Sequence, residues 1–155
     1  MFASARGQWR FLILVLLVLG LAWADAWSAS IDGYAFVNED GTLRMRGKTI
    51  RLYGIHIPET GVTCKSAFRP PLCGTRAAVA LTFKLNAGWP HCEPVERHPD
   101  RSITARCHVD DTDLSAYLLK SGWAVAMPDA PIEYHALEKI ARARRIGVWG
   151  IAIGE

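Results

Sequence analysis

The stretch Gly47-Lys-Thr-Ile-Arg-Leu-Tyr-Gly-Ile-His-Ile-Pro-Glu59 contains the pattern that decides the fold. Polar and apolar side chains alternate from Thr42 to Arg46, and after a turn at Gly47-Lys48 the alternation continues from Thr49 to Ile55. Successive side chains of a strand point to opposite faces, so this alternation around a glycine-containing turn predicts a β-hairpin. Asn38 to Gly41 supplies a further turn before the hairpin.

Helical and strand patterns alternate along the rest of the chain. Apolar residues at helical spacing predict a helix over Gly74–Asn86, and β-rich segments predict strands near Trp89–Glu93 and Ile103–Val109. The polar segment Pro94–Asp100 between those strands is expected to be an exposed loop. Asp113 is a suitable N-cap for a short helix over Leu114–Ser121.

The last helix is expected to begin at Pro131 and to stop before Gly147. Its predicted buried stripe consists of Tyr134, Leu137, Ile140 and Ala141. Strands clustered early, then a helix, two strands and two helices, indicate an α+β fold. We expect a small five-stranded OB-type β-barrel with about three helices.

The N-terminal residues have the features of a secretory signal peptide. Arg6 and Arg10 precede an unbroken apolar run from Phe11 to Ala24, and small residues follow it. A membrane anchor is the alternative, but the run is shorter than the ~20 apolar residues that span a bilayer. We expect cleavage after Ala24, with Ser28 or Ala29 as alternatives, and then one domain over 25–155. The mature protein is expected to be periplasmic or secreted, monomeric and without stable membrane insertion.

The net charge of the mature domain is close to zero. The chain has 18 Lys and Arg against 15 Asp and Glu, and Arg6 and Arg10 leave with the signal peptide, so 16 against 15 remain. A net charge of about +1 gives little support for broad electrostatic binding to nucleic acid.

The four cysteines all follow the predicted signal peptide: Cys64, Cys73, Cys92 and Cys107. An even number in an exported chain indicates two disulfides. Three pairings are open, and we favour Cys64–Cys73, closing a proline-rich loop, with Cys92–Cys107 joining two neighbouring strands. A zinc site is the less favoured alternative, because neither pair has the short spacing of zinc ligands.

The stretch from Gly47 to Glu59 resembles the signature of thermonuclease-like (staphylococcal nuclease-like) domains, written G-x-x-I-R-L-x-G-I-D-x-P-E. Further landmarks follow in the family's order over roughly Gly33–Trp149: Cys73-Gly74, Ala105-Arg106-Cys107, Asp113-Leu114, Gly122-Trp123-Ala124 and Gly147-Val148-Trp149. The resemblance implies hydrolysis of phosphodiester bonds in DNA or RNA, with a calcium ion held by carboxylates. It assigns Arg51 as a catalytic arginine that stabilises the transition state, and Glu59 as the glutamate that helps to activate water.

Other site positions depart from the family pattern. His56 stands where the family has a metal-binding aspartate, and Gly41 falls on the second one, although a shift of one residue brings Asp40 close. The candidate metal ligands are therefore Glu39, Asp40 and His56. Calcium prefers oxygen ligands, whereas imidazole suits a transition metal. The alternative is that His56 is a tolerated polar loop residue.

The second catalytic arginine of the family has no unambiguous counterpart. Counting back from Cys107 without gaps places Ser102 there, whereas Arg101 serves if the loop carries one extra residue; otherwise Arg101 is an ordinary exposed loop arginine. Three functions stay open: a weak or altered phosphodiesterase, a binding module of the cell envelope for nucleic acid, acidic polysaccharide or protein, and a structural protein without a ligand.

Overall fold

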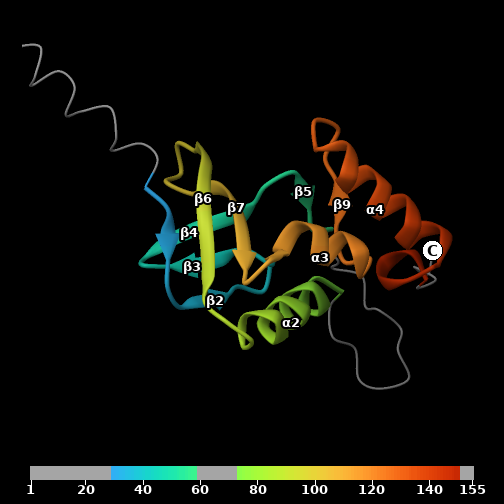
Figure 1. Cartoon of the computed structure of the whole chain (residues 1–155), viewed down its shortest axis with the longest axis horizontal. Coiled ribbons are helices and arrows are strands. Elements are labelled where there is room, and N and C mark those ends of the chain that lie inside the picture. The colour runs from blue at the N-terminus through green and yellow to red at the C-terminus, as the bar shows by residue number, and fades with distance from the viewer. Residues whose placement is uncertain (1–28, 59–72, 151–155) are drawn as a thin grey trace, which may run out of the picture.

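The computed structural model describes residues 29–58 and 73–150 (Figure 1). The predicted signal peptide, Glu59 and the Cys64 half of the predicted Cys64–Cys73 pair lie outside these residues. None of the described helices has the length and apolar character needed to span a membrane.

A curled mixed sheet forms one side of the molecule. Among the described residues it joins seven short strands, in the order β1 (Ile31–Asp32), β6 (Pro90–Arg97), β7 (Ile103–Val109), β4 (Lys48–Leu52), β3 (Leu43–Met45) and β2 (Ala35–Val37), with β8 (Thr112–Asp113) pairing with β7. All neighbours are antiparallel except β4 and β7, which run parallel. The hairpin predicted around Gly47 is confirmed as β3 and β4, with Leu43 opposite Ile50.

The strand predicted over Thr49–Ile55 is interrupted. β4 ends at Leu52, and after a turn β5 (Ile55–His56) pairs with β9 (Val125–Ala126) in a second, two-stranded sheet. Gly54 makes this turn with φ of +71°, and a Cβ there would lie 3.1 Å from the ring of Tyr134. The close approach of that ring and the left-handed backbone both require glycine.

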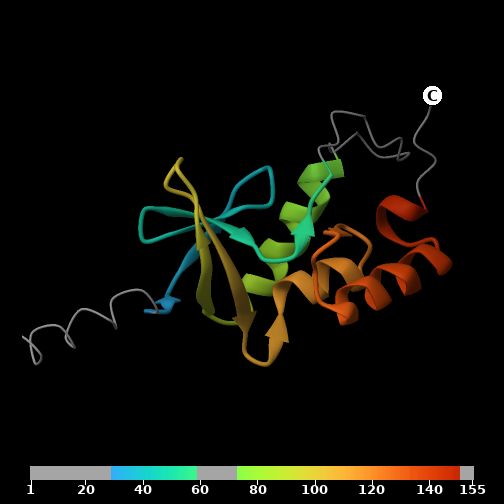
Figure 2. The same cartoon turned by 90° about the horizontal axis from the view of Figure 1, so that it is seen from above.

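Three α-helices and one short 3-10 helix accompany the sheets in the described part of the chain: α2 (Cys73–Leu85), α3 (Leu114–Lys120), α4 (Ile132–Ala143) and η2 (Gly147–Trp149). Figures 1 and 2 show the strands of the main sheet at one end of the molecule and α4 at the other, with α2 and α3 between them and the β5–β9 pair beside α4. The predicted cap of α3 is confirmed, since Asp113 accepts a hydrogen bond from the Ala116 amide at 3.0 Å.

The predicted buried stripe of α4 is wrong at one position. Ile140 is 46% exposed, whereas Glu138, which was not part of the predicted stripe, is buried. Glu138 tolerates burial because its carboxylate accepts hydrogen bonds from the Ala126 amide at 3.0 Å and from Arg142 Nε at 2.8 Å. The guanidinium of Arg142 also lies over the ring of Trp149, so this arginine ties the last turn of α4 to η2.

The predicted loop over Pro94–Asp100 is shorter than expected. β6 continues to Arg97, with a register shift between Pro94 and Glu96. The proline sits at this irregularity, where a strand tolerates a residue without an N–H group. The connection between β6 and β7 therefore reduces to 98–102.

One apolar core lies between the inner face of the main sheet and the helices α2 and α3. Its fully buried side chains include Leu43, Ile50, Leu81, Leu114 and Leu118. The predicted disulfide between Cys92 and Cys107 is confirmed, and it joins directly opposed residues of β6 and β7. The α+β class and the three helices are confirmed for the described residues, whereas a barrel of five strands is not.

Candidate functional site

Arg51 projects from the outward face of β4. Its neighbours in the strand, Ile50 and Leu52, are buried in the core, so the alternation of the strand directs Arg51 away from it. Across the parallel pair, Arg51 is in register with Thr104 on β7. Since β7 begins at Ile103, the connection that precedes this strand lies next to the arginine.

Two residues of that connection bind the guanidinium of Arg51. Arg51 Nε donates to Ser102 Oγ at 3.1 Å, and Arg51 Nη2 donates to Asp100 Oδ2 at 3.0 Å. The other oxygen of Asp100 accepts hydrogen bonds from the amide and the hydroxyl of Ser102, at 2.9 and 2.6 Å. The three side chains thus form a closed network that fixes the orientation of the arginine.

The carboxylate of Asp100 is strongly stabilised in its charged form. The hydrogen bonds from the Ser102 hydroxyl and amide, followed by that from Arg51, lower the pKa of Asp100 to about 2. Asp100 therefore remains ionised near neutral pH and offsets the positive charge of Arg51. Both side chains are 55% exposed, so water and ligands reach the pair.

Arg51 has donors for an anion that the described residues leave free, but the negative charge of Asp100 lies beside them. Its guanidinium is held in one orientation, and the described residues use only its Nε and one terminal nitrogen as donors. A bound phosphate or carboxylate can accept from the remaining N–H groups. The same anion is repelled by Asp100, which weakens binding without blocking it.

Of the two candidates for the second arginine position, Ser102 is the one that the described hydrogen bonds join to Arg51. Ser102 is almost fully buried, whereas Arg101 is exposed at the end of the turn. Arg101 has φ of +67°, and its amide donates to the His98 carbonyl at 2.9 Å. None of the hydrogen bonds in the described residues joins the side chain of Arg101 to the network.

Glu39 and Asp40, two of the candidate metal ligands, lie in the turn between β2 and β3. The carboxylate of Asp40 is hydrogen-bonded within this turn. Asp40 Oδ1 accepts from the amide of Thr42 at 2.9 Å and from its hydroxyl at 2.7 Å. Gly41 has φ of +78°, and a Cβ at this position would lie 2.2 Å from Ile57 Cδ1. A carboxylate at position 41 would therefore require both Ile57 and the backbone to move.

The remaining candidate ligands are exposed and belong to different elements. His56 lies on β5 opposite Val125, and Glu39 lies in the turn between β2 and β3. Residues 29–58 and 73–150 contain no group of three His, Cys, Asp or Glu side chains placed to hold a metal ion. The structure thus does not bring Glu39, Asp40 and His56 together as a ligand set, and Glu59 lies outside the described residues.

Asp100 is the member of this site that sequence reasoning missed. Its signal is the Asp-x-Ser spacing of Asp100 and Ser102, in which an aspartate side chain binds the amide two residues later. That spacing indicates a turn, but it does not reveal that the second oxygen faces a strand residue 49 positions away.

Comparison with protein-family models and with curated proteins finds no match to this chain.

Proposed function

We propose that this protein is an exported thermonuclease-like domain, built on an OB-like barrel, that binds the phosphodiester backbone of nucleic acid at Arg51. We further propose that its hydrolytic activity is weak or altered, without the calcium centre implied by the resemblance. The order of the landmarks from Gly47 to Trp149, the curled sheet and the three helices support the family assignment. The Cys92–Cys107 disulfide fits export to an oxidising compartment, as the N-terminal sequence indicates.

The observation that carries this proposal is the hydrogen-bonded contact between Arg51 and Ser102. The resemblance assigns these two positions to a pair of arginines that face the same phosphate. They are neighbours here, although they are separated by 51 residues in the chain, as a common site requires. One arginine is retained and the other is replaced by a buried serine.

The replacements explain why efficient calcium-dependent cleavage is not expected. Loss of one charge-stabilising group costs roughly 10²–10³ in rate. Calcium needs several oxygen ligands, whereas Gly41 supplies none and His56 offers a nitrogen. A site with one arginine and no bound metal can hold a phosphodiester, but it lacks the group that generates the nucleophile.

A binding module without catalytic activity is the second candidate, favoured by the pairing of Asp100 with Arg51. A carboxylate beside the retained arginine weakens stabilisation of a doubly charged transition state more than it weakens binding of a singly charged phosphodiester. The ligand of such a module would be a nucleic acid or another anionic polymer, such as an acidic polysaccharide.

One experiment separates the two candidates. The purified protein is incubated with single-stranded DNA in the presence of calcium, manganese, zinc or a chelator, and both cleavage and binding are measured. Arg51→Ala is compared with Arg144→Ala, which removes an equally charged, exposed side chain outside the site. Arg51→Ala is expected to weaken DNA binding severalfold, while Arg144→Ala has little effect.

Metal-dependent cleavage that disappears in Arg51→Ala and persists in Arg144→Ala would establish the hydrolase. Binding without cleavage under every metal condition would establish the binding module. Equal DNA affinity of Arg51→Ala and the unaltered protein would contradict both, because each assigns the phosphate contact to Arg51.

A further inference from the structure

The outward face of β2 and β3 presents aromatic and basic side chains next to one another. Ala35 and Met45 point into the core, so Tyr34 and Phe36 point outward and are 67% and 63% exposed. Their rings meet edge to face, with centroids 4.9 Å apart. Phe36 is directly opposite Arg44 in the antiparallel pair. Clustered exposed aromatic residues mark interaction surfaces more often than single ones do.

Two hollows adjoin this aromatic pair. Tyr34 and Phe36 line both of them. The first hollow, of about 510 Å³, is also lined by Trp89, whose side chain is among the most exposed large apolar groups of the protein. The second, of about 570 Å³, is lined by Arg44 and Arg46. Both volumes fall within the range of roughly 300–1,000 Å³ that holds small ligand groups.

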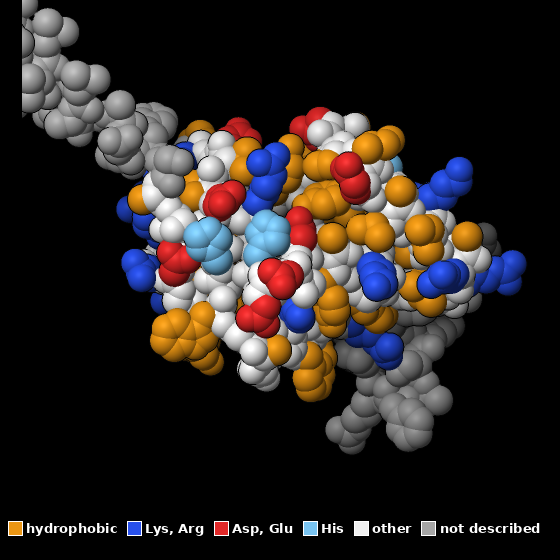
Figure 3. All heavy atoms as spheres, viewed as in Figure 1, with side chains coloured by type: hydrophobic (Ala, Val, Ile, Leu, Met, Phe, Trp, Pro, Cys, Tyr) orange, Lys and Arg blue, Asp and Glu red, His pale blue; other side chains and the backbone are white. Residues whose placement is uncertain are grey.

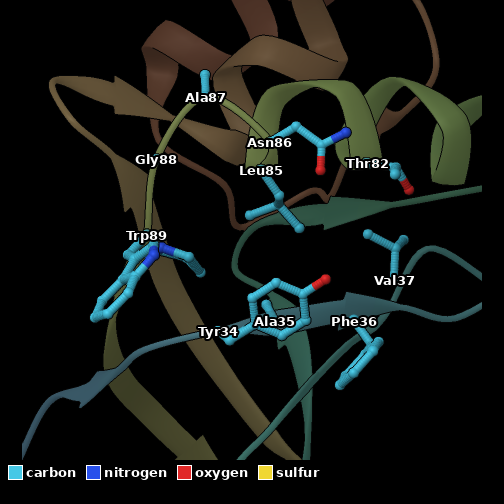
Figure 4. A pocket seen from close by; sticks show the side chains of 11 residues that line it. Tyr34, Ala35, Phe36, Val37, Thr82, Leu85, Asn86, Ala87, Gly88 and Trp89 are labelled. Atoms are coloured by element: carbon cyan, nitrogen blue, oxygen red, sulfur yellow. The ribbon is translucent and has the colours of Figure 1, made fainter.

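Figure 4 shows how the side chains of the first hollow are arranged. Tyr34 lies between Trp89 on one side and Phe36 on the other, and the amide group of Asn86 lies across the hollow from Tyr34. The hollow thus combines ring surfaces with hydrogen-bonding groups at its edge. This combination suits flat heterocycles, which stack on rings and present polar edges.

The second hollow adds positive charge that the described residues do not neutralise by direct pairing. Neither Arg44 nor Arg46 forms an ion pair in the part of the chain that the structure describes. In Figure 3, basic side chains gather around the tip of the β3–β4 hairpin, and hydrophobic side chains lie next to them over β2. A ligand that carries both flat rings and negative charges complements this surface.

The same face continues to the proposed phosphodiester site. Arg44 is opposite Thr49 on β4, and Arg51 lies two residues further along that strand, on the same side. Residues in such diagonal positions are roughly 7–8 Å apart, which long side chains can bridge. Aromatic rings, then Arg44, then Arg51 therefore follow one another across the outward faces of β2, β3 and β4.

We propose that this face is a base-stacking platform for single-stranded nucleic acid, in which Tyr34, Phe36 and Trp89 stack against bases while Arg44 and Arg46 contact the phosphates. The inference deepens the proposed function, on which it rests for the placement of the next phosphodiester at Arg51. Paired duplex DNA is excluded from the platform, because its bases are already stacked on one another and do not expose their faces. Alternating ring surfaces and cations favour a single strand over a polysaccharide, because every base has a π-face that stacks on an aromatic ring and a sugar ring has none.

The test measures binding of a fluorescein-labelled oligothymidylate of about 12 nucleotides, within the usual site size of an OB-type fold. The variants are Tyr34→Ala with Phe36→Ala, and separately Trp89→Ala. The matched control is Phe83→Ala, which removes a 72% exposed aromatic side chain that lines neither hollow. Each platform variant is expected to lose roughly tenfold or more in affinity, whereas the control retains the affinity of the unaltered protein.

The salt dependence of binding tests the basic half of the platform. Replacement of Arg44 and Arg46 by glutamine is expected to reduce the slope of log affinity against log salt by about 0.7 for each phosphate contact removed. Arg144→Gln serves as the control for the loss of a surface charge. Because all the replaced side chains are exposed, circular dichroism of every variant is expected to match that of the unaltered protein.

The outcomes separate the platform from the Arg51 site. Loss of binding in the platform variants, with the Phe83→Ala protein unaffected, supports the platform whatever Arg51→Ala does. Unchanged binding in the platform variants, together with a loss in Arg51→Ala, overturns the platform and leaves the Arg51 site intact. Binding of duplex as tight as that of the single strand, or binding of an acidic polysaccharide with no binding of oligothymidylate, also overturns the platform.

Discussion

The helical end of the molecule and the site around Arg51 differ in how far they match the thermonuclease-like pattern that the sequence resembles. At the helical end, the pattern residues have direct packing roles: Gly54 admits the ring of Tyr134, and Asp113 caps α3. At the site, the pattern is broken where chemistry would need it, at Gly41, His56 and Ser102. A sequence pattern can therefore persist because it specifies packing, and its presence does not by itself establish activity.

The largest expected effect concerns packing at the helical end, where Gly122 and Gly147 are in backbone contact. Gly147 has φ of +61°, and a Cβ there would lie 2.2 Å from the carbonyl oxygen of Gly122. Val148 also donates a hydrogen bond to that oxygen at 2.9 Å, so neither backbone segment can move freely. We expect Gly147→Ala to lower the free energy of unfolding by about 3–5 kcal/mol, measured by urea denaturation.

Gly47→Ala provides the matched control. Gly47 has φ of +74°, but a Cβ there would meet no atom within 4 Å. It therefore carries only the cost of the left-handed backbone, about 1–2 kcal/mol. Equal destabilisation by the two substitutions would show that backbone strain, and not the contact of the two segments, accounts for the cost of replacing Gly147.

Elements with local signals could be predicted from the sequence. The N-cap of α3 at Asp113 follows from a residue type, and the bounds of β7 in the main sheet follow from a period of alternation. The burial of Glu138 could not be predicted in this way. It depends on the amide of Ala126 and on Arg142, which three-dimensional packing brings to the carboxylate.

At the site, the sequence pointed to the contact between Arg51 and Ser102 but not to the charge beside it. The spacing from Cys107 identifies Ser102 as the neighbour of Arg51, and the structure has this contact. The partial neutralisation of Arg51 by Asp100 depends on the parallel pairing of β4 with β7, which no local pattern encodes. The platform was missed for the same reason, since Tyr34 and Trp89 are separated in sequence and meet only through β2 and the end of α2.

A smaller effect is expected at the site around Arg51, where the charge of Asp100 can be removed. Asp100→Asn keeps an oxygen to accept from Ser102 but removes the negative charge beside Arg51. We expect the affinity for single-stranded DNA to rise roughly two- to fivefold, as for other exposed charge pairs, with a steeper salt dependence. The measurement is fluorescence anisotropy over a range of salt concentrations.

Asp111→Asn is the control for this experiment, since it removes one exposed negative charge from the chain in another loop. An equal rise in affinity for both variants would indicate a general effect of net charge. A fall in affinity for Asp100→Asn would mean that Asp100 supports ligand binding by orienting Arg51, which would reverse the role assigned to it.

The smallest expected effect concerns the exposed pair of Asp32 on β1 and His91 on β6. This pair lies outside the site and serves as a comparison for the pair of Arg51 and Asp100. The hydrogen bond to Asp32 raises the pKa of His91 above 6.5, its ordinary value. Hydrogen bonds from Ser30 and His91 in turn lower the pKa of Asp32 below 3.8. Because the folded pKa of His91 is raised, its contribution to stability is complete below pH 6.5 and is lost as the pH rises through the folded pKa.

Asp32→Asn is therefore expected to lower the pKa of His91 toward 6.5, as followed by the imidazole resonances in an NMR titration. Glu93→Gln is the comparison variant, since its carboxylate lies further from the ring, at 3.6 Å from Nε2, and ranks below Asp32 as a cause of the shift. A larger change in Glu93→Gln than in Asp32→Asn would contradict that order. If Asp100→Asn leaves DNA affinity unchanged, the pair of Arg51 and Asp100 is a surface ion pair like that of His91 and Asp32. The turn at 98–102 would then orient Arg51 without serving a ligand.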